Sequence, residues 1–277
     1  MIERTFGRRA NPPGGSAPQT KPKAEAGRAG GDGAGPTDGT TAAQTYPWQD
    51  DPDGILCNFA FGDLAHNLAP RLVVDGRIHA ETYLTAAGAI AGMAAQTALF
   101  QTRPGREEVF VVTSSAGGKY YFGDPLNRML MADGAAQADF RVWNVAAGTA
   151  TSLGVPASDL PSVDDMFGHV TDSLGQKHEG YASVPGHHAL VPVGPLLGLV
   201  WPFAAHCLNG KLSSANLSSG PKPAPVKWWP AITAWVASRA IKDVSDVLDP
   251  KIALVVLMEA AIHASKLDLA SLELVEG

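Results

Sequence analysis

Cysteine is nearly absent from this chain of 277 residues, which contains only Cys57 and Cys207, each in an apolar segment. A disulfide-stabilised scaffold needs more cysteines, and a structural zinc site needs them at clustered spacing. We therefore expect both thiols to be reduced residues of a hydrophobic core. The N-terminus also lacks the apolar stretch of a signal peptide, so we expect a cytoplasmic protein.

Charged residues are few as well, at 17%, and the sequence shows no basic stripe of the kind that marks a nucleic-acid-binding surface. Residues 1–45 hold six Lys and Arg against four Asp and Glu, which leaves fifteen against twenty-three for the remainder. The remainder is therefore acidic, and we expect no nucleic acid among its partners.

Large apolar residues are scarce in the first 45 positions, where Ile2 and Phe6 stand among Gly, Pro, Ala, Thr and Lys. Burial of so little apolar surface cannot offset the entropy lost on ordering the segment. We predict a disordered N-terminal tail over 1–45 and a globular α+β domain over 46–277. The Pro- and Ser-rich stretch 211–227 indicates a long exposed loop and is a candidate boundary between two subdomains.

The longest uncharged segment, residues 83–100, is rich in Ala and Gly and predicts a long buried helix. Its length of about 18 residues would also suit a membrane span, and Gly88 and Gly92 form the G-x-x-x-G spacing found between membrane helices. The segment is poor in Leu, Ile and Phe, however, and contains Thr85 and Gln96. This composition favours the central helix of a soluble domain over a membrane span.

Two short segments, 108–113 and 119–122, are β-branched or aromatic and flank a glycine-containing turn. They predict a β-hairpin. Apolar and polar residues alternate over 140–145, which predicts a third strand. We expect a small antiparallel sheet of about three strands.

The dipeptide Asp-Pro occurs at 124–125 and at 249–250, and it is typical of a helix start in which Asp is the N-cap. The second pair precedes a largely apolar helix over 251–265, and an amphipathic helix over 228–248 comes before it. The short connection predicts a helical hairpin. A further helix is expected to begin near 195 with a kink at Pro202.

These elements predict a mainly α, α+β fold in which Ala-rich buried helices pack on a small antiparallel sheet. Candidate catalytic residues are His79, Glu81, His187 and His188. His79-Ala80-Glu81 matches the first half of the zinc deaminase pattern, but the Pro-Cys-x-x-Cys half is absent. A histidine at a helix entry, followed by a glutamate that the helix dipole stabilises, is the interpretation we favour.

His187 and His188 are adjacent in a loop, where imidazoles can bind a transition metal or act as acid and base, although loop histidines without a function are common. Glu259 and His263 stand four residues apart on an apolar helix and therefore share one face. Buried ionisable groups need partners, so we favour a structural pair. A metal site formed with His79 and Glu81 between facing helices is the alternative.

A complete catalytic set is missing from these motifs. We therefore expect a noncatalytic binding or assembly protein without a cofactor, whose partner is another protein or a second copy of the chain. The alternative is a small-molecule enzyme, such as a metal-dependent hydrolase, that uses some of the same histidines and glutamates.

Overall fold

The computed structural model describes residues 46–102, 108–114, 117–131, 140–212 and 220–275, so the tail expected over 1–45 lies outside the described residues. Within the described ranges, the chain forms eight α-helices and two antiparallel sheets of two strands each. The helices are α1 (Gly54–Asn67), α2 (Ala80–Thr102), α3 (Asp124–Leu130), α4 (Val142–Ser152), α5 (Val163–Ser173), α6 (Val193–Leu208), α7 (Trp229–Val244) and α8 (Pro250–Lys266). The expected mainly α, α+β fold is confirmed.

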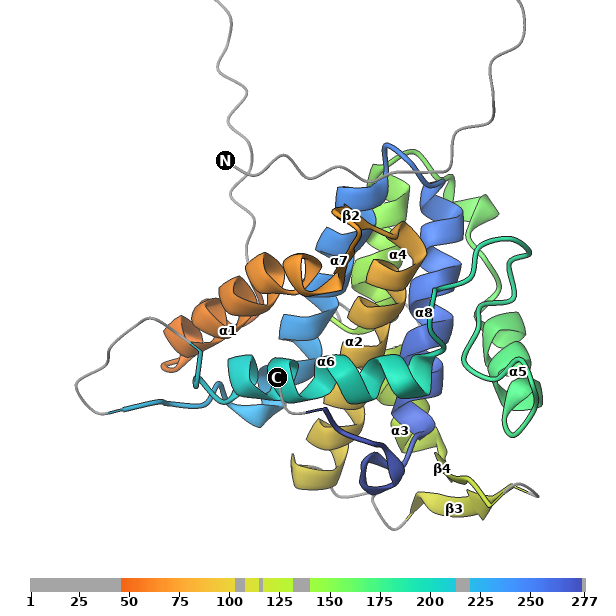
Figure 1. Ribbon diagram of the computed structural model, residues 1–277. Coiled ribbons are helices and arrows are strands. Elements are labelled where there is room, and N and C mark those ends of the chain that lie inside the picture. The colour runs from red at the N-terminus through yellow and green to blue at the C-terminus, as the bar shows by residue number, and fades with distance from the viewer. Residues whose placement is uncertain (1–45, 103–107, 115–116, 132–139, 213–219, 276–277) are drawn as a thin grey trace, which may run out of the picture. The chain divides into compact units, whose positions relative to one another are not determined.

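Helix α2 lies at the centre of the helical layer and contacts α6, α7 and α8, while α4 packs against α7 and α5 against α8 (Figure 1). It is the one helix of the described ranges long and apolar enough to cross a membrane, but 89% of its most apolar window is buried inside the fold. The absence of charge from residues 82–102 of this helix is therefore explained by burial against its neighbours.

Glycine permits the close approach of α2 to α8. A Cβ atom at Gly88 would collide with the carbonyl oxygen of Leu257, and one at Gly92 would collide with that of Ala261. The spacing of the two glycines therefore serves close helix packing, as the small-residue content predicted.

Both sheets are hairpins. Strands β1 (Val73–Val74) and β2 (Arg77–Ile78) pair across a turn whose residues, Asp75 and Gly76, have φ of 51° and 76°. The predicted hairpin is confirmed as β3 (Phe110–Thr113) and β4 (Lys119–Phe122), which pair from Phe110 with Phe122 to Thr113 with Lys119.

The third strand predicted over 140–145 is wrong, because α4 begins at Val142. Alternation over six residues also fits the start of a helix. The buried residues Val142, Ala146, Thr149 and Ala150 follow at helical spacing, and this longer pattern fixes one face of α4 against α7.

The two Asp-Pro pairs begin helices by different means. Asp249 is the N-cap of α8, and its carboxylate accepts a hydrogen bond from the Lys251 N–H at 2.7 Å. Asp124 is instead the first residue of α3, and the preceding Gly123 caps without a side chain, so the predicted Asp124 N-cap is wrong. Proline occupies the first turn in both helices, where its missing N–H costs no hydrogen bond.

Candidate functional site

One face of the buried helix α8 bears three ionisable side chains. Glu259, His263 and Lys266 are spaced four and three residues apart, and each is at most 3% exposed. This face lies against α5 and β4. Because a buried charge is costly without a partner, the partners of these three side chains decide what the face can do.

Glu259 is held by the loop that follows α5. Its two carboxylate oxygens accept hydrogen bonds from the Ser183 N–H at 2.6 Å and from the Ser183 hydroxyl at 2.7 Å. His169 Nε2 lies 3.9 Å from the same carboxylate and 3.1 Å from the carbonyl oxygen of Tyr181. Burial raises the pKa of Glu259, and the bonds from Ser183 offset this only in part. Both carboxylate oxygens of Glu259 therefore have a hydrogen-bond donor within the fold.

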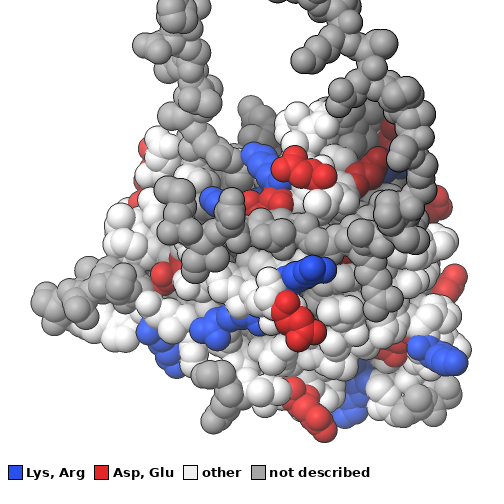
Figure 2. Space-filling model, turned by 45° about the horizontal axis from the view of Figure 1, so that its top comes forward, with Lys and Arg blue, Asp and Glu red and all other residues white. Residues whose placement is uncertain are grey.

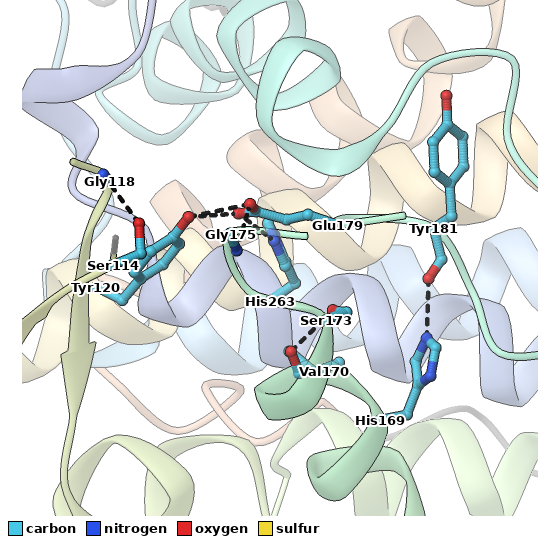
Figure 3. A network of polar contacts seen from close by, with 10 residues as sticks. All are labelled: Ser114, Gly118, Tyr120, His169, Val170, Ser173, Gly175, Glu179, Tyr181 and His263. Atoms are coloured by element: carbon cyan, nitrogen blue, oxygen red, sulfur yellow. Dashed lines mark hydrogen bonds and ion pairs between the residues drawn. The ribbon is translucent and has the colours of Figure 1, made fainter. Parts of the chain in front are cut away.

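His263 belongs to a second network, drawn in Figure 3. Its Nε2 lies 3.2 Å from Glu179, which also accepts hydrogen bonds from the Tyr120 hydroxyl at 2.8 Å and from the Gly175 N–H at 2.8 Å. Burial alone would raise the pKa of Glu179, but the bonds from His263, Tyr120 and Gly175 outweigh it and lower the pKa. Burial, together with this carboxylate, raises the pKa of Tyr120 to about 12.

The space around these networks is small. Glu259 and His263 both line a cavity of about 10 Å³, enough for a single water molecule. The structure thus pairs Glu259 with Ser183 and His263 with Glu179, rather than with each other or with His79 and Glu81. In the described ranges no three His, Cys, Asp or Glu side chains form a group that can hold a metal ion.

Three of the four catalytic candidates meet where α2 begins. Glu81 lies between two histidines, with one oxygen 3.0 Å from His187 Nδ1 and the other 3.5 Å from His79 Nε2. His79 Nδ1 also accepts a hydrogen bond from the Thr82 N–H at 3.4 Å, and the Thr82 hydroxyl accepts one from the Leu190 N–H at 2.9 Å. The group therefore closes the start of α2 and attaches the 187–190 loop to it, as a helix-entry role requires.

His188 points elsewhere. Its ring packs edge-on against Tyr181, with 5.8 Å between the ring centroids. The adjacent histidines therefore act separately: His187 joins Glu81, and His188 joins the loop that holds Glu259.

Lys266 is the third ionisable residue of the α8 face, and it differs from the other two. Its Nζ lies 4.6 Å from the ring centroid of Phe122 and 5.6 Å from that of Phe167, and it has no carboxylate partner in the described ranges. Burial lowers the pKa of Lys266 to about 8. Two phenyl faces stabilise the ammonium less than water does, so the neutral amine gains in population.

Lys266 lines a pocket of about 580 Å³, a volume typical of small-molecule sites. Two helix faces form its walls, because the lining residues of each helix recur at spacings of three and four. The face of α5 contributes Asp164, Phe167, Gly168, Thr171 and Asp172. The face of α3 contributes Asp124, Asn127 and Arg128, and Met131 follows directly after this helix. Phe122 comes from the end of β4.

Asn127, which also lines the pocket, has a side-chain oxygen without a hydrogen-bond partner among the described residues. The Asn127 Oδ1 atom is buried and accepts no hydrogen bond from the described residues. A buried amide oxygen of this kind is costly unless a donor reaches it. Lys266 and Asn127 are therefore both polar residues of the pocket whose hydrogen-bonding capacity is unused by the described part of the chain.

Lys266 was not among the residues that the sequence motifs indicated, although its position continues the spacing of Glu259 and His263 along one helix face. The cysteines behave as expected. Cys57 and Cys207 are both buried free thiols, and burial raises the pKa of each to about 12. Neither is a nucleophile at neutral pH.

The pocket beside Lys266 combines volume, two phenyl rings and a buried amine, whereas the carboxylates of Glu81, Glu179 and Glu259 already have internal partners. The pocket is therefore the candidate functional site. Comparison of the chain with protein-family models, with curated proteins and with solved structures finds no match.

Proposed function

We propose that the protein is a noncatalytic binding protein that takes a small organic molecule in the pocket between α3, β4, α5 and α8. The observation that carries the proposal is the pocket of about 580 Å³ whose walls include Phe122, Phe167 and Lys266. The two phenyl rings can supply affinity for an apolar body, and the charged and polar side chains that make up the rest of the lining can orient the ligand.

The charges around the pocket favour a neutral ligand over an anion. The lining contains two basic residues, Lys266 and Arg128, and three acidic ones, Asp124, Asp164 and Asp172. Two positive charges against three negative ones give a site that does not attract phosphate or carboxylate groups. An uncharged molecule with an aromatic or aliphatic body and one polar group fits both the walls and the charge.

Gly168 offers a direct way to close the pocket. It lies on the exposed face of α5, and a Cβ atom there meets nothing within 4 Å, so a leucine adds bulk without displacing the backbone. Gly148 on α4 is a matched control, since it is also an exposed helical glycine with open space around its Cβ direction, and it does not line the pocket.

Ligand-observed NMR with benzyl alcohol as the probe tests the proposal on the full chain. We expect the wild type and Gly168→Leu to differ, with binding lost in Gly168→Leu and retained in Gly148→Leu. Equal binding by all three proteins would place the probe elsewhere, and binding by none would remove the proposed ligand class.

Glu81 supports a second candidate function, an enzyme that uses acid–base chemistry. A carboxylate that contacts two imidazoles can hold one of them in the orientation a general base needs. The metal-dependent form of this candidate lacks a ligand group in the described ranges. Hydrolysis of p-nitrophenyl acetate by wild type and Glu81→Gln tests it: loss of turnover at an unchanged melting temperature favours the enzyme, and equal background rates favour the binding protein.

A further inference from the structure

The amine of Lys266 is buried beside two aromatic rings. Lys266 is the last residue of α8, it is 2% exposed, and its Nζ is flanked by the rings of Phe122 and Phe167, with no carboxylate partner among the described residues. A lysine that forms an ion pair has an acidic partner, and a lysine that contributes to solubility is exposed to water. Lys266 has neither environment.

The residue after Lys266 is paired with a strand. Leu267 forms a bridge with Tyr120 of β4, and Phe122 is two residues further along the same strand. The amine and one of its aromatic neighbours are therefore held by one piece of antiparallel structure. A nucleophile on such a support keeps its position when a ligand enters.

We infer that the Lys266 amine captures a small, uncharged aldehyde or ketone in this pocket as an imine. The inference rests on the proposed binding function and names the class of ligand. The aromatic walls suit the body of such a molecule, and the lining charges disfavour its anionic relatives.

The step is balanced without another reagent. The nitrogen lone pair of the neutral amine attacks the carbonyl carbon, and the electron pair of the C=O π bond moves to oxygen, which takes up a proton. Transfer of the nitrogen protons and loss of that oxygen as water then form the C=N bond. One amine and one carbonyl compound give one imine and one water, with no change of oxidation state, and hydrolysis reverses the capture.

The electrostatics of the site support this chemistry. With a pKa of about 8, Lys266 is neutral in about a tenth of the molecules at pH 7, whereas fewer than about one in a thousand ordinary lysines are neutral at that pH. Desolvation is a recognised way to activate a lysine for imine formation, and Lys266 is 2% exposed. The alternative is a structural role, in which the Lys266 ammonium only packs on the phenyl rings. A structural ammonium would not react with a carbonyl compound faster than other lysines do.

Reductive trapping distinguishes a reactive amine at Lys266 from a purely structural cation. Wild-type protein is mixed at pH 7 with limiting benzaldehyde and sodium cyanoborohydride, which reduces an imine to a stable benzylamine, and labelled lysines are located by peptide mass mapping. We expect Lys266 to be labelled at least about tenfold faster than the exposed Lys251 of the same helix. Labelling of Lys266 at or below the rate of Lys251 would overturn the inference.

Two further arms connect the reaction to the pocket. Gly168→Leu should lose the fast labelling of Lys266, Gly148→Leu should keep it, and benzyl alcohol should protect Lys266 by competition. Fast labelling that neither Gly168→Leu nor benzyl alcohol reduces would contradict capture in the pocket. If benzyl alcohol binds but Lys266 is not labelled faster than Lys251, the imine inference fails while the proposed binding function stands. If benzyl alcohol does not bind either, both fail.

Discussion

Gln96 of α2 donates a hydrogen bond from Nε2 to the carbonyl oxygen of Leu267 at 2.8 Å, immediately after the end of α8. The same amide donates to the carbonyl oxygen of Ser265 at 2.8 Å. The last carbonyls of a helix have no partner within it, so a buried helix end needs such a donor. These two bonds lie on either side of Lys266 and join the central helix to the candidate site.

Replacement of Gln96 by leucine should lower the free energy of unfolding by about 1–3 kcal/mol, because two buried carbonyl groups lose their donor. Gln101→Leu, at an exposed position of the same helix, is the matched control and should change stability little. Urea unfolding measures both. Equal effects of the two variants would show that the buried amide bonds contribute nothing.

Gly92 should not tolerate even one added methyl group. In Gly92→Ala the Cβ atom collides with the carbonyl oxygen of Ala261, so the two helices must separate, at a cost of about 1–3 kcal/mol or more. Gly148→Ala meets open space and should be neutral or stabilising by up to about 1 kcal/mol, because alanine favours helix. Thermal unfolding of the pair measures the difference, and a Gly92→Ala protein as stable as Gly148→Ala would disprove the close packing of α2 on α8.

The buried amine should make stability depend on alkaline pH. The pKa of Lys266 is about 8 in the folded state against an ordinary value of 10.5, so the unfolded chain binds more protons between these values and stability rises with pH across that window. The cost of burying the ammonium is fully present below pH 8 and is relieved above it. Other pocket groups, Asp124, Arg128, Asp164 and Asp172, are present in both proteins of a comparison with Lys266→Met.

Relative to Lys266→Met, the wild type should therefore gain about 2–3 kcal/mol of unfolding free energy between pH 7 and pH 11. Lys251→Met controls for the loss of a lysine from the same helix at an exposed position. Urea unfolding across this pH range gives the difference. A constant difference between wild type and Lys266→Met would show that the amine keeps its ordinary pKa.

Glu179 should also make stability rise with pH, but in the acidic range. Its folded pKa is lowered from 4.5, so its contribution is present above the unfolded value and is lost as pH falls through the folded one. Glu179→Gln weakens the bonds from His263, Tyr120 and Gly175 and should cost about 1–3 kcal/mol at pH 7. The variant should also lose less stability on acidification than the wild type, and parallel acid unfolding curves would contradict this assignment.

The sequence predicted the elements whose pattern is long or local. The uncharged run 83–100 within α2 and the Asp249 cap of α8 could be predicted because composition and capping act within one segment. The strand predicted over 140–145 was wrong because six alternating residues fit either a strand or the first turns of a helix. Packing against α7 decides between the two structures.

The site was less predictable. Glu81 meets His187 across 106 residues, and His263 meets Glu179 across 84, so neither contact is present in local spacing. Lys266 had a usable signal in its spacing from Glu259 and His263 on one helix face. The sequence could not show that its two neighbours on that face find internal partners while Lys266 lines a pocket instead.

Chemical-shift mapping of the full chain with benzyl alcohol tests the central claim most directly, because it places the ligand without relying on a variant. We predict concentration-dependent shifts confined to the pocket, at Phe122, Asn127, Phe167, Thr171 and Lys266. Shifts centred on Glu81 and His187 instead, or no saturable shifts in the pocket, would contradict the proposal that this pocket is the binding site.

The face shown in Figure 2 bears interspersed acidic and basic side chains among the described residues, so a probe without charge also avoids unspecific attraction to that surface. The predicted result is one saturable site with the pocket residues in fast exchange. The contradicting result is a set of weak, unsaturated shifts spread over the surface.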